Sequence, residues 1–441
     1  MLCMMVSKMR IRCGMAGLAL LAASLAAVHA TGFRISYCFR DGSITWTNAF
    51  HAGVCNVQTA ATPEGPWTPF TNVFTTNSSA SVPLGTAPTN RFVRALATDV
   101  SATNENGFAN LTQSYGLIRT IAGNGAGRID TVNYWLSEYE GGFATNAALS
   151  RPHFAMADAA GNVFIADKDS HSVLKITRDG RIHTAAGTHV AGTGADTANW
   201  ATNVALNSPN GLWVGGDGSV YILDTGNGKV RWLATNGLMT TLFTVTGGIG
   251  GGRGLWVRDD RALAYFINGN DLKRWTSGGT LKSLNNDNFV DPGNIWVKAD
   301  GDVIITDRGA NLVYLVTATG VSAGTRTVLF GDGSNSPVVD GTPALNNGLY
   351  GVRGVWPVPT GGYLLATHEG SQILYVDTAG ILHVLLDGYP GYSYGDGEWF
   401  YTPGWKVSEV RSVSMDFHGN ILIVENDAGY LRQVDFQRLQ P

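Results

Sequence analysis

The composition of the 441-residue chain limits the kind of protein it can be. Charged residues make up 15%, the net charge is -4, and no block of like charge occurs. This argues against nucleic-acid binding, which needs clustered Lys and Arg. Hydrophobic residues reach 44%, which argues against a disordered chain. The 57 glycines fall between short apolar runs, so we predict many short strands joined by tight turns in an all-β fold.

Residues 1–30 carry the features of a secretory signal peptide. Three basic residues precede an apolar run from Gly14 to Val28, and Val28-His29-Ala30 supplies a small-x-small cleavage signal. We therefore expect the mature chain to begin near Thr31 and to be secreted, periplasmic or displayed at the cell surface. A retained amino-terminal anchor is the alternative, but the run is short for a membrane span. We expect no membrane span after signal removal.

Residues 31–99 are predicted to form a small β module. Ser43–Trp46, Gly53–Val57 and Arg91–Ala95 are predicted strands because they alternate in polarity and are rich in β-branched residues. The segment resembles a truncated fibronectin-type or immunoglobulin-like module, so we expect a sandwich-like arrangement. Residues 100–116 are polar and lack periodicity, and they are interpreted as a linker.

Only two cysteines follow the signal segment, Cys38 and Cys55. In an oxidising compartment we expect them to form a disulfide, which would contribute about 3 kcal/mol by closing the loop between them. The alternative is two buried free thiols. No Cys/His spacing suggests a zinc site.

From Leu117 to the carboxyl end the sequence repeats itself. Six units align, beginning at His153, Asn210, Arg253, Gly293, Arg353 and Arg411. Each unit has an apolar strand, a tight glycine or aspartate turn, a second apolar strand, a polar turn and a third strand. A fourth strand follows in most units, as in Ile381–Val384. Four short antiparallel strands per unit is the pattern of a propeller blade.

The sixth unit lacks its fourth strand and ends at Val434–Phe436. A matching orphan strand, Leu117–Ala122, precedes the first complete unit. We therefore predict that this early strand completes the last sheet, which closes the ring and removes two open sheet edges.

Gly161–Ile176 is the best copy of the repeat, and it resembles the NHL repeat of secreted bacterial proteins. The inserts Ala195–Pro209 and Asp340–Leu345 also resemble those found between NHL blades. The resemblance covers Leu117 to Phe436 and implies a six-bladed β-propeller over residues 117–441. The third unit is the shortest copy, because its polar turn is reduced.

In such a blade, the segment that enters the first strand lies on the same face as the turn between the second and third strands. The long entering segments are 130–150, 189–207, 332–349 and 387–409. Since loops on a rigid scaffold carry function, we predict that this face binds the ligand.

Four tryptophans, Trp213, Trp256, Trp296 and Trp356, recur at one position of the first strand. A binding stripe is one interpretation. We prefer the other, in which these rings pack between neighbouring blades as core residues, and each contributes about 2–3 kcal/mol when buried.

The start of each first strand is predicted to lie at the mouth of the central channel. The residues at this position are His153, Asn210, Arg253, Asn294, Arg353 and Arg411. Three arginines would repel one another there, so we expect either carboxylate partners or an anionic ligand such as a sugar acid. The candidate partners at the ends of the second strands are Asp167, Asp224, Asp307, His368 and Glu425. The alternative is that these acids only cap the turns that follow them.

Aromatic residues are dense in the inserts. The predicted aromatic rim consists of Trp200, Trp399, Tyr401 and Trp405. Flat apolar rings beside a few acids suit carbohydrate or peptide binding, although the same rings can simply anchor long loops.

Some relatives implied by the resemblance are enzymes, namely the amidating lyase, virginiamycin lyase and the gluconolactonases, which hold metal ions at the channel mouth. This sequence shows no set of histidines there and no nucleophile–base pair, so we assign no catalytic residue. We expect no cofactor, with a calcium ion held by oxygen ligands left open. We predict a monomeric binding or scaffold protein for a protein, peptide or carbohydrate ligand. The alternative is a metal-dependent lactonase or lyase.

Overall fold

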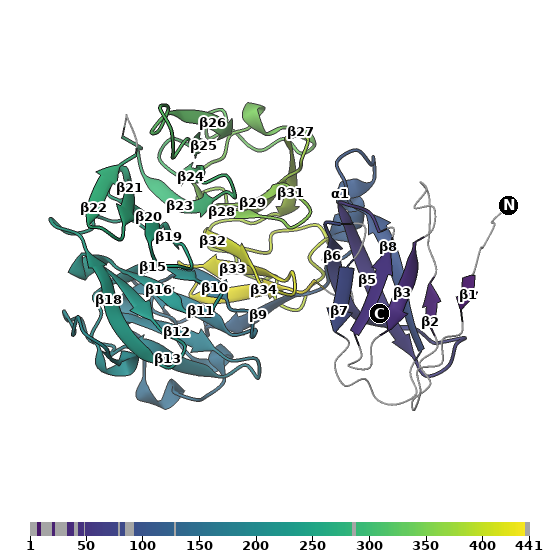
Figure 1. The fold of residues 1–441 in the computed structure, drawn as a ribbon, viewed down its shortest axis with the longest axis horizontal. Coiled ribbons are helices and arrows are strands. Elements are labelled where there is room, and N and C mark those ends of the chain that lie inside the picture. The colour runs from purple at the N-terminus through teal and green to yellow at the C-terminus, as the bar shows by residue number, and fades with distance from the viewer. Residues whose placement is uncertain are drawn as a thin grey trace.

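The computed structural model of the protein describes residues 7–9, 20–22, 33–38, 43–47, 49–77, 80–83, 92–127, 129–284 and 288–436. The chain is almost entirely β, as predicted, and forms a small amino-terminal module beside a large ring of sheets (Figure 1). No helix in the described segments is long and apolar enough to cross a membrane. The predicted signal peptide falls mostly outside these segments.

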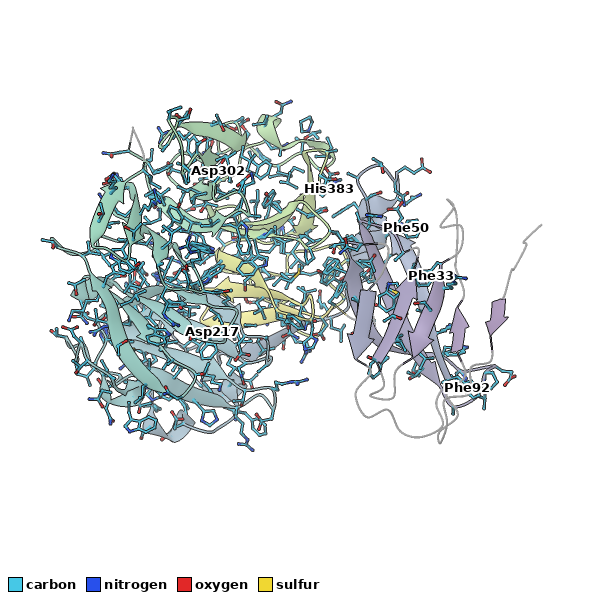
Figure 2. All side chains as sticks on the ribbon, in the orientation of Figure 1. Phe33, Phe50, Phe92, Asp217, Asp302 and His383 are labelled. Atoms are coloured by element: carbon cyan, nitrogen blue, oxygen red, sulfur yellow. The ribbon has the colours of Figure 1, made fainter. Side chains whose placement is uncertain are left out.

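The amino-terminal module consists of two sheets packed face to face. One sheet has the order β1 (Ser7–Met9), β2 (Leu20–Ala22), β8 (Phe92–Asp99), β5 (Gly53–Ala60) and β6 (Thr68–Thr75). The other has the order β3 (Arg34–Cys38), β4 (Ser43–Thr47) and β7 (Ala80–Pro83). Ile35 and Trp46 from the second sheet pack against Val57 and Val93 from the first, which makes the core of the module. Figure 2 labels Phe33, Phe50 and Phe92 in this module.

Cys55 is a free thiol in the structure, so the predicted disulfide between Cys38 and Cys55 is not formed. The Cys55 side chain is fully buried on β5 among Val57, Ala97 and other apolar residues. Burial raises the pKa of this thiol to about 12, so it stays protonated and behaves as a small apolar core residue.

The segment expected to be an irregular linker contains a helix, α1 (Gly107–Thr112), and docks the module on the ring. Phe108 stacks on His383, with ring centroids 4.2 Å apart, and His383 lies on the side of the ring that faces the module (Figure 2). Tyr115 is buried 4.9 Å from Phe436, and Phe74 of β6 stacks on Phe436 at 4.2 Å. The two parts therefore share one apolar core.

The ring consists of six antiparallel sheets, numbered here propeller sheets 1 to 6 in chain order, in the described part of the chain. Sheet 1 contains β10 (Pro152–Ala157), β11 (Val163–Asp167), β12 (Ser172–Ile176) and β13 (Ile182–Gly187). Sheet 2 contains β15 (Pro209–Val214), β16 (Val220–Asp224), β17 (Lys229–Leu233), β18 (Leu238–Thr244) and β14 (Asn199–Trp200). Sheet 3 contains β19 (Leu255–Val257), β20 (Leu263–Asn268), β21 (Asp271–Thr276) and β22 (Thr280–Ser283).

Sheet 4 contains β23 (Pro292–Val297), β24 (Val303–Asp307), β25 (Leu312–Val316) and β26 (Arg326–Phe330). Sheet 5 contains β28 (Val352–Pro357), β29 (Tyr363–Thr367), β30 (Gln372–Val376), β31 (Ile381–Leu386) and β27 (Thr342–Pro343). Sheet 6 contains β32 (Val410–Met415), β33 (Ile421–Glu425), β34 (Tyr430–Val434) and β9 (Ile118–Ala122). Short 3-10 helices lie at Ser137–Tyr139, Ala144–Asn146, Lys168–Ser170, Ala201–Asn203, Thr225–Asn227 and Ala344–Asn346.

Strand β9 pairs antiparallel with β34, with Ile118 opposite Val434 and Ala122 opposite Leu431. The orphan strand thus completes the last sheet, as the repeat pattern predicted. Ile118, Val434 and Leu431 are fully buried, so the pairing is part of the core rather than an exposed edge.

Glycines let the first strands of neighbouring sheets approach closely around the axis. A Cβ atom at Gly211 of β15 would overlap the Arg253 carbonyl oxygen, and one at Gly293 would lie 2.6 Å from the Arg353 carbonyl oxygen. The first strands contact one another in sequence, and β32 contacts β10, so the ring is closed. Gly211 and Gly293 are therefore required by this tight approach.

The four repeated tryptophans meet inside the ring. Trp213 lies 6.3 Å from Trp256 and 5.7 Å from Trp296, while Trp296 lies 5.0 Å from Trp356, all measured between ring centroids. Trp356 is buried and the other three are partly buried against the hydrophobic clusters. Their packing makes them core residues around the axis.

Candidate functional site at the channel mouth

A β-bulge marks the start of the first strand in five of the six propeller sheets. The register shifts between Pro152 and Phe154 in β10, and the same shift recurs in β15, β23, β28 and β32. The residues that the ladder skips include His153, Asn210, Asn294, Arg353 and Arg411. A bulge interrupts the alternation of side chains along a strand. The bulged polar residues can therefore point in another direction than the apolar residues beside them.

The skipped residues do not all play the same part. Asn210 donates to the carbonyl oxygens of Gly251 and Gly252, at 3.2 and 2.9 Å, and so ties sheet 2 to the entry of sheet 3. The backbone N–H of Ile295 donates to the Asn294 side chain at 2.8 Å. Burial, followed by the charges of Arg411 and Arg253, holds the pKa of His153 well below its usual range, so His153 is neutral.

The acids at the ends of the second strands do not pair with the channel arginines. Asp224 accepts a hydrogen bond from the Asn207 backbone N–H at 2.8 Å, and Asp307 accepts one from the Asp291 N–H at 2.8 Å. Glu425 accepts one from the Ser408 N–H at 2.7 Å. These acids accept hydrogen bonds from the backbone of the segment that enters each first strand. This role is structural, like the turn capping that was considered as the alternative.

Two of these acids have buried arginine partners elsewhere. The Asp224 carboxylate is 2.9 Å from Nε of Arg231, and both side chains are fully buried. Sheet 6 contains the equivalent ion pair, in which the Glu425 carboxylate is 2.7 Å from Nε of Arg432. Arg231 and Arg432 lie on the third strands, away from the mouth, so the predicted link between these acids and the mouth arginines is not formed.

Arg253, together with Arg308 and Arg151, instead meets carboxylates that the repeat pattern did not reveal. These are Asp291, just before β23, and Glu369 and Asp427, in the turns after the second strands of sheets 5 and 6. They form a chain of contacts from sheet 3 round to sheet 1, listed in order: Arg253–Asp291, Asp291–Arg308, Arg308–Glu369, Glu369–His368, His368–Asp427 and Asp427–Arg151. His368 thus links two acids, Glu369 and Asp427.

Arg353 and Arg411 stand apart from this chain of contacts. Both side chains are more than nine-tenths buried, with residue exposures of 4% and 7%. In the described chain, Nε and Nη1 of Arg353 and Nε of Arg411 have no hydrogen-bond partner. Arg353 also has no carboxylate within 4.0 Å among the described residues, and Arg411 comes only to 3.9 Å from Asp427.

The contact between Arg411 and His368 does not satisfy Arg411. Nη2 of Arg411 lies 3.4 Å from Nε2 of His368, and the same Nε2 lies 2.8 Å from the Asp427 carboxylate. A carboxylate oxygen only accepts, so Nε2 must carry the proton that Asp427 receives. The guanidinium of Arg411 therefore faces another donor.

The pKa values follow from this arrangement. Burial, and then the charges of the other arginines, lower the pKa of Arg353 to about 8 and that of Arg411 to about 9. Burial acts to raise the pKa of Asp427, but the hydrogen bond from His368 and the charges of Arg411 and Arg151 outweigh it and hold the pKa at about 2. The mouth is thus a buried site with unmatched positive charge.

Aromatic side chains of the last insert form a second feature on the same face. Tyr389 stacks on Trp405 at 4.5 Å, Tyr392 lies 5.6 Å from Trp405, and Tyr394 lies 5.9 Å from Tyr392. All four rings are at least 45% exposed. We call Tyr389, Tyr392, Tyr394 and Trp405 the tyrosine cluster.

The tyrosine cluster is fixed to sheet 6 by buried polar groups. Ser393 donates to Glu425 at 2.7 Å and accepts from Arg432 at 2.6 Å, and the Gly391 N–H donates to Ser408 at 2.8 Å. Because Glu425 ends β33 at the mouth side, the cluster stands on the face that carries the channel mouth.

Of the four residues predicted for the aromatic rim, only Trp405 belongs to this cluster. Trp200 pairs with Leu238 at the turn between the third and fourth strands of sheet 2, which is the opposite face. Trp399 pairs with Leu117 beside the start of β9, also away from the mouth, and Tyr401 lies near Trp399. Parts of the inserts pair with the outer strands of the sheets. These parts therefore lie along the side of the propeller and not at the mouth.

No three His, Cys, Asp or Glu side chains are grouped so that they could hold a metal ion, within the segments that the structure describes. Metal analysis of the purified protein is the test of the lactonase or lyase alternative.

The arrangement defines a β-propeller protein with a cluster of polar residues at the starts of its first strands and an amino-terminal β module. No protein-family model matches the chain, and no curated protein matches it. A structural genomics protein of unknown function from Bacteroides thetaiotaomicron has a TM-score of 0.56 at 12% identity, covering 93% of this chain and 99% of that one. Auxiliary nutrient binding proteins from Bacteroides ovatus (TM-score 0.55, 10% identity, 90% and 94% covered) and Bacteroides thetaiotaomicron (0.53, 11%, 92% and 98%) are similar too. These likenesses concern the fold.

Proposed function

We propose that the protein is an exported, six-bladed NHL-type propeller that binds a carbohydrate or peptide ligand on the face bearing the channel mouth. The observation that carries this proposal is the tyrosine cluster, in which four exposed rings stand on an insert that is hydrogen-bonded to buried residues of sheet 6. Rigid exposed aromatic rings offer large contact area at little entropic cost, and their phenol groups donate and accept hydrogen bonds.

Two further observations support the proposal. A signal-like segment precedes the module, which is consistent with export. Similar structures that cover most of both chains include proteins described as auxiliary nutrient binding proteins. A nutrient-derived glycan or peptide is therefore the first ligand class to test.

The test is a screen of the purified protein against glycan and peptide arrays, followed by calorimetry with each hit. Trp405→Ala should weaken binding about tenfold because it removes the ring on which Tyr389 stacks. Phe417→Ala is the matched control, since Phe417 is 77% exposed and lies at the turn after β32, on the opposite face. Blank arrays, or equal affinity of Trp405→Ala and wild type, would overturn the proposal.

A further inference from the structure

We propose that the channel mouth is a binding site for a carboxylate, centred on Arg353 and Arg411. The inference rests on the proposed function, because it names the chemical group by which the ligand would be held, but it uses residues outside the tyrosine cluster. The argument begins with hydrogen bonding. Nearly all buried polar groups in folded proteins have partners, and those that lack one need an explanation.

The two arginines occupy equivalent positions on adjacent first strands. Each is the skipped residue of a bulge, Arg353 in β28 and Arg411 in β32, and these strands contact one another. A buried guanidinium without a partner costs several kcal/mol. The bulges nevertheless direct two such groups to the same mouth, with Arg253 close to both. A ligand that accepts hydrogen bonds and carries negative charge would satisfy them.

The charged groups at the mouth favour an anionic ligand. The arginines are Arg151, Arg253, Arg308, Arg353 and Arg411, and the carboxylates are Asp130, Asp291, Glu369 and Asp427. The arginines exceed these carboxylates by one. A ligand carboxylate would offset this excess of positive charge.

Geometry also favours a carboxylate. A carboxylate has two oxygens that can each accept a charge-assisted hydrogen bond, and Arg353 and Arg411 each have an unbonded Nε. Asn210 and His153 are buried nearby and interact with each other, and these neutral polar groups would lie next to the carboxylate. A sugar acid or another small hydroxy acid has this combination of groups.

The experiment is calorimetric titration of the full chain with D-glucuronate, with D-glucose as the uncharged counterpart and with inorganic phosphate and sulfate as dianions. We expect glucuronate to bind and glucose not to bind. Arg353→Gln and Arg411→Gln should each weaken glucuronate binding at least about tenfold. Arg178→Gln, a change at an exposed arginine on the opposite face, should leave it unchanged.

Thermal unfolding of the same variants without ligand separates a binding role from a structural one. Because Arg353 is unpaired, Arg353→Gln should melt at or above the wild-type temperature while it loses glucuronate binding. Absence of glucuronate binding, binding of phosphate or sulfate in its place, or a lower melting temperature for Arg353→Gln would overturn the carboxylate site. Binding of glucuronate with blank glycan and peptide arrays would leave this site standing and overturn only the role of the tyrosine cluster.

Discussion

Asp167 is a buried carboxyl group whose ionised form is disfavoured by burial. It ends β11, is fully buried, and neither carboxylate oxygen has a hydrogen-bond partner in the described chain. Burial raises its pKa from 3.8 to about 7. The same position in sheets 2 and 4 holds acids that accept backbone N–H groups at 2.8 Å. In sheet 1 the Ser150 and Ser170 groups near Asp167 do not outweigh the effect of its burial.

The raised pKa of Asp167 predicts a pH dependence of stability. Between about pH 4 and pH 7 the folded protein holds a proton that the unfolded chain has released, so stability falls as the pH rises through this window. The contribution is at most about 1.4 kcal/mol per pH unit. Asp167→Asn should remove it, as measured by urea unfolding of both proteins at several pH values. Parallel pH profiles would contradict the assignment.

The close approach of the backbone at Gly211 predicts that a side chain at this position destabilises the fold. Gly211→Ala should lower stability by about 1–3 kcal/mol, because the added Cβ atom overlaps the Arg253 carbonyl oxygen of the next sheet. Gly278→Ala is the control, since no atom lies within 4 Å of a Cβ atom at that position. Chemical denaturation measures both variants, and similar losses for the two would contradict the close approach of the first strands.

The strand pattern of each element could be predicted from the sequence, because the period of the repeat is a local property. Strands such as β11 and β16 fall within the predicted units, and β9 closes the ring as expected. The path of the inserts could not be predicted, because it depends on which outer strand offers a free edge. Trp200 illustrates this, since β14 adds to β18 and places the ring on the opposite face.

The partners of the mouth arginines were missed for a related reason. Asp291, Glu369 and Asp427 lie in loops outside the aligned strand positions, so no repeat comparison marks them. A signal was present, because Glu369 and Asp427 each come two residues after the end of their second strand. Sheet-to-sheet distances are needed to show that these acids meet Arg308 and Arg411.

The clasp between β9 and β34 leads to a prediction at the element scale. Replacing residues 117–122 by a Gly/Ser segment of equal length should lower the free energy of unfolding by at least about 3 kcal/mol, since Ile118 and Ala122 are fully buried. The matched control replaces β22 in the same way. It is also the outermost strand of its sheet, but all four of its residues are exposed. Equal losses in urea unfolding would contradict the clasp.

At the scale of the whole molecule, the small module and the propeller are joined by direct contacts as well as by the chain. Asn72 of β6 donates to the Ser114 carbonyl oxygen at 2.7 Å, and Tyr115 donates to the Gly419 carbonyl oxygen at 3.2 Å. Both bonds are buried, so the segment between the two parts is held in place. The module is therefore in direct contact with the propeller through this segment.

This docking predicts that the two parts unfold together. Phe74→Ala should lower stability by about 1–3 kcal/mol, because it removes the ring that stacks on Phe436 at 4.2 Å. It should also make residues 100–106 accessible to limited proteolysis before the propeller unfolds. Phe70→Ala on the same strand is the control, since Phe70 is 37% exposed. If Phe74→Ala is cleaved no faster than Phe70→Ala and melts with it, the module is held by the linker alone and the shared core does not stabilise the molecule.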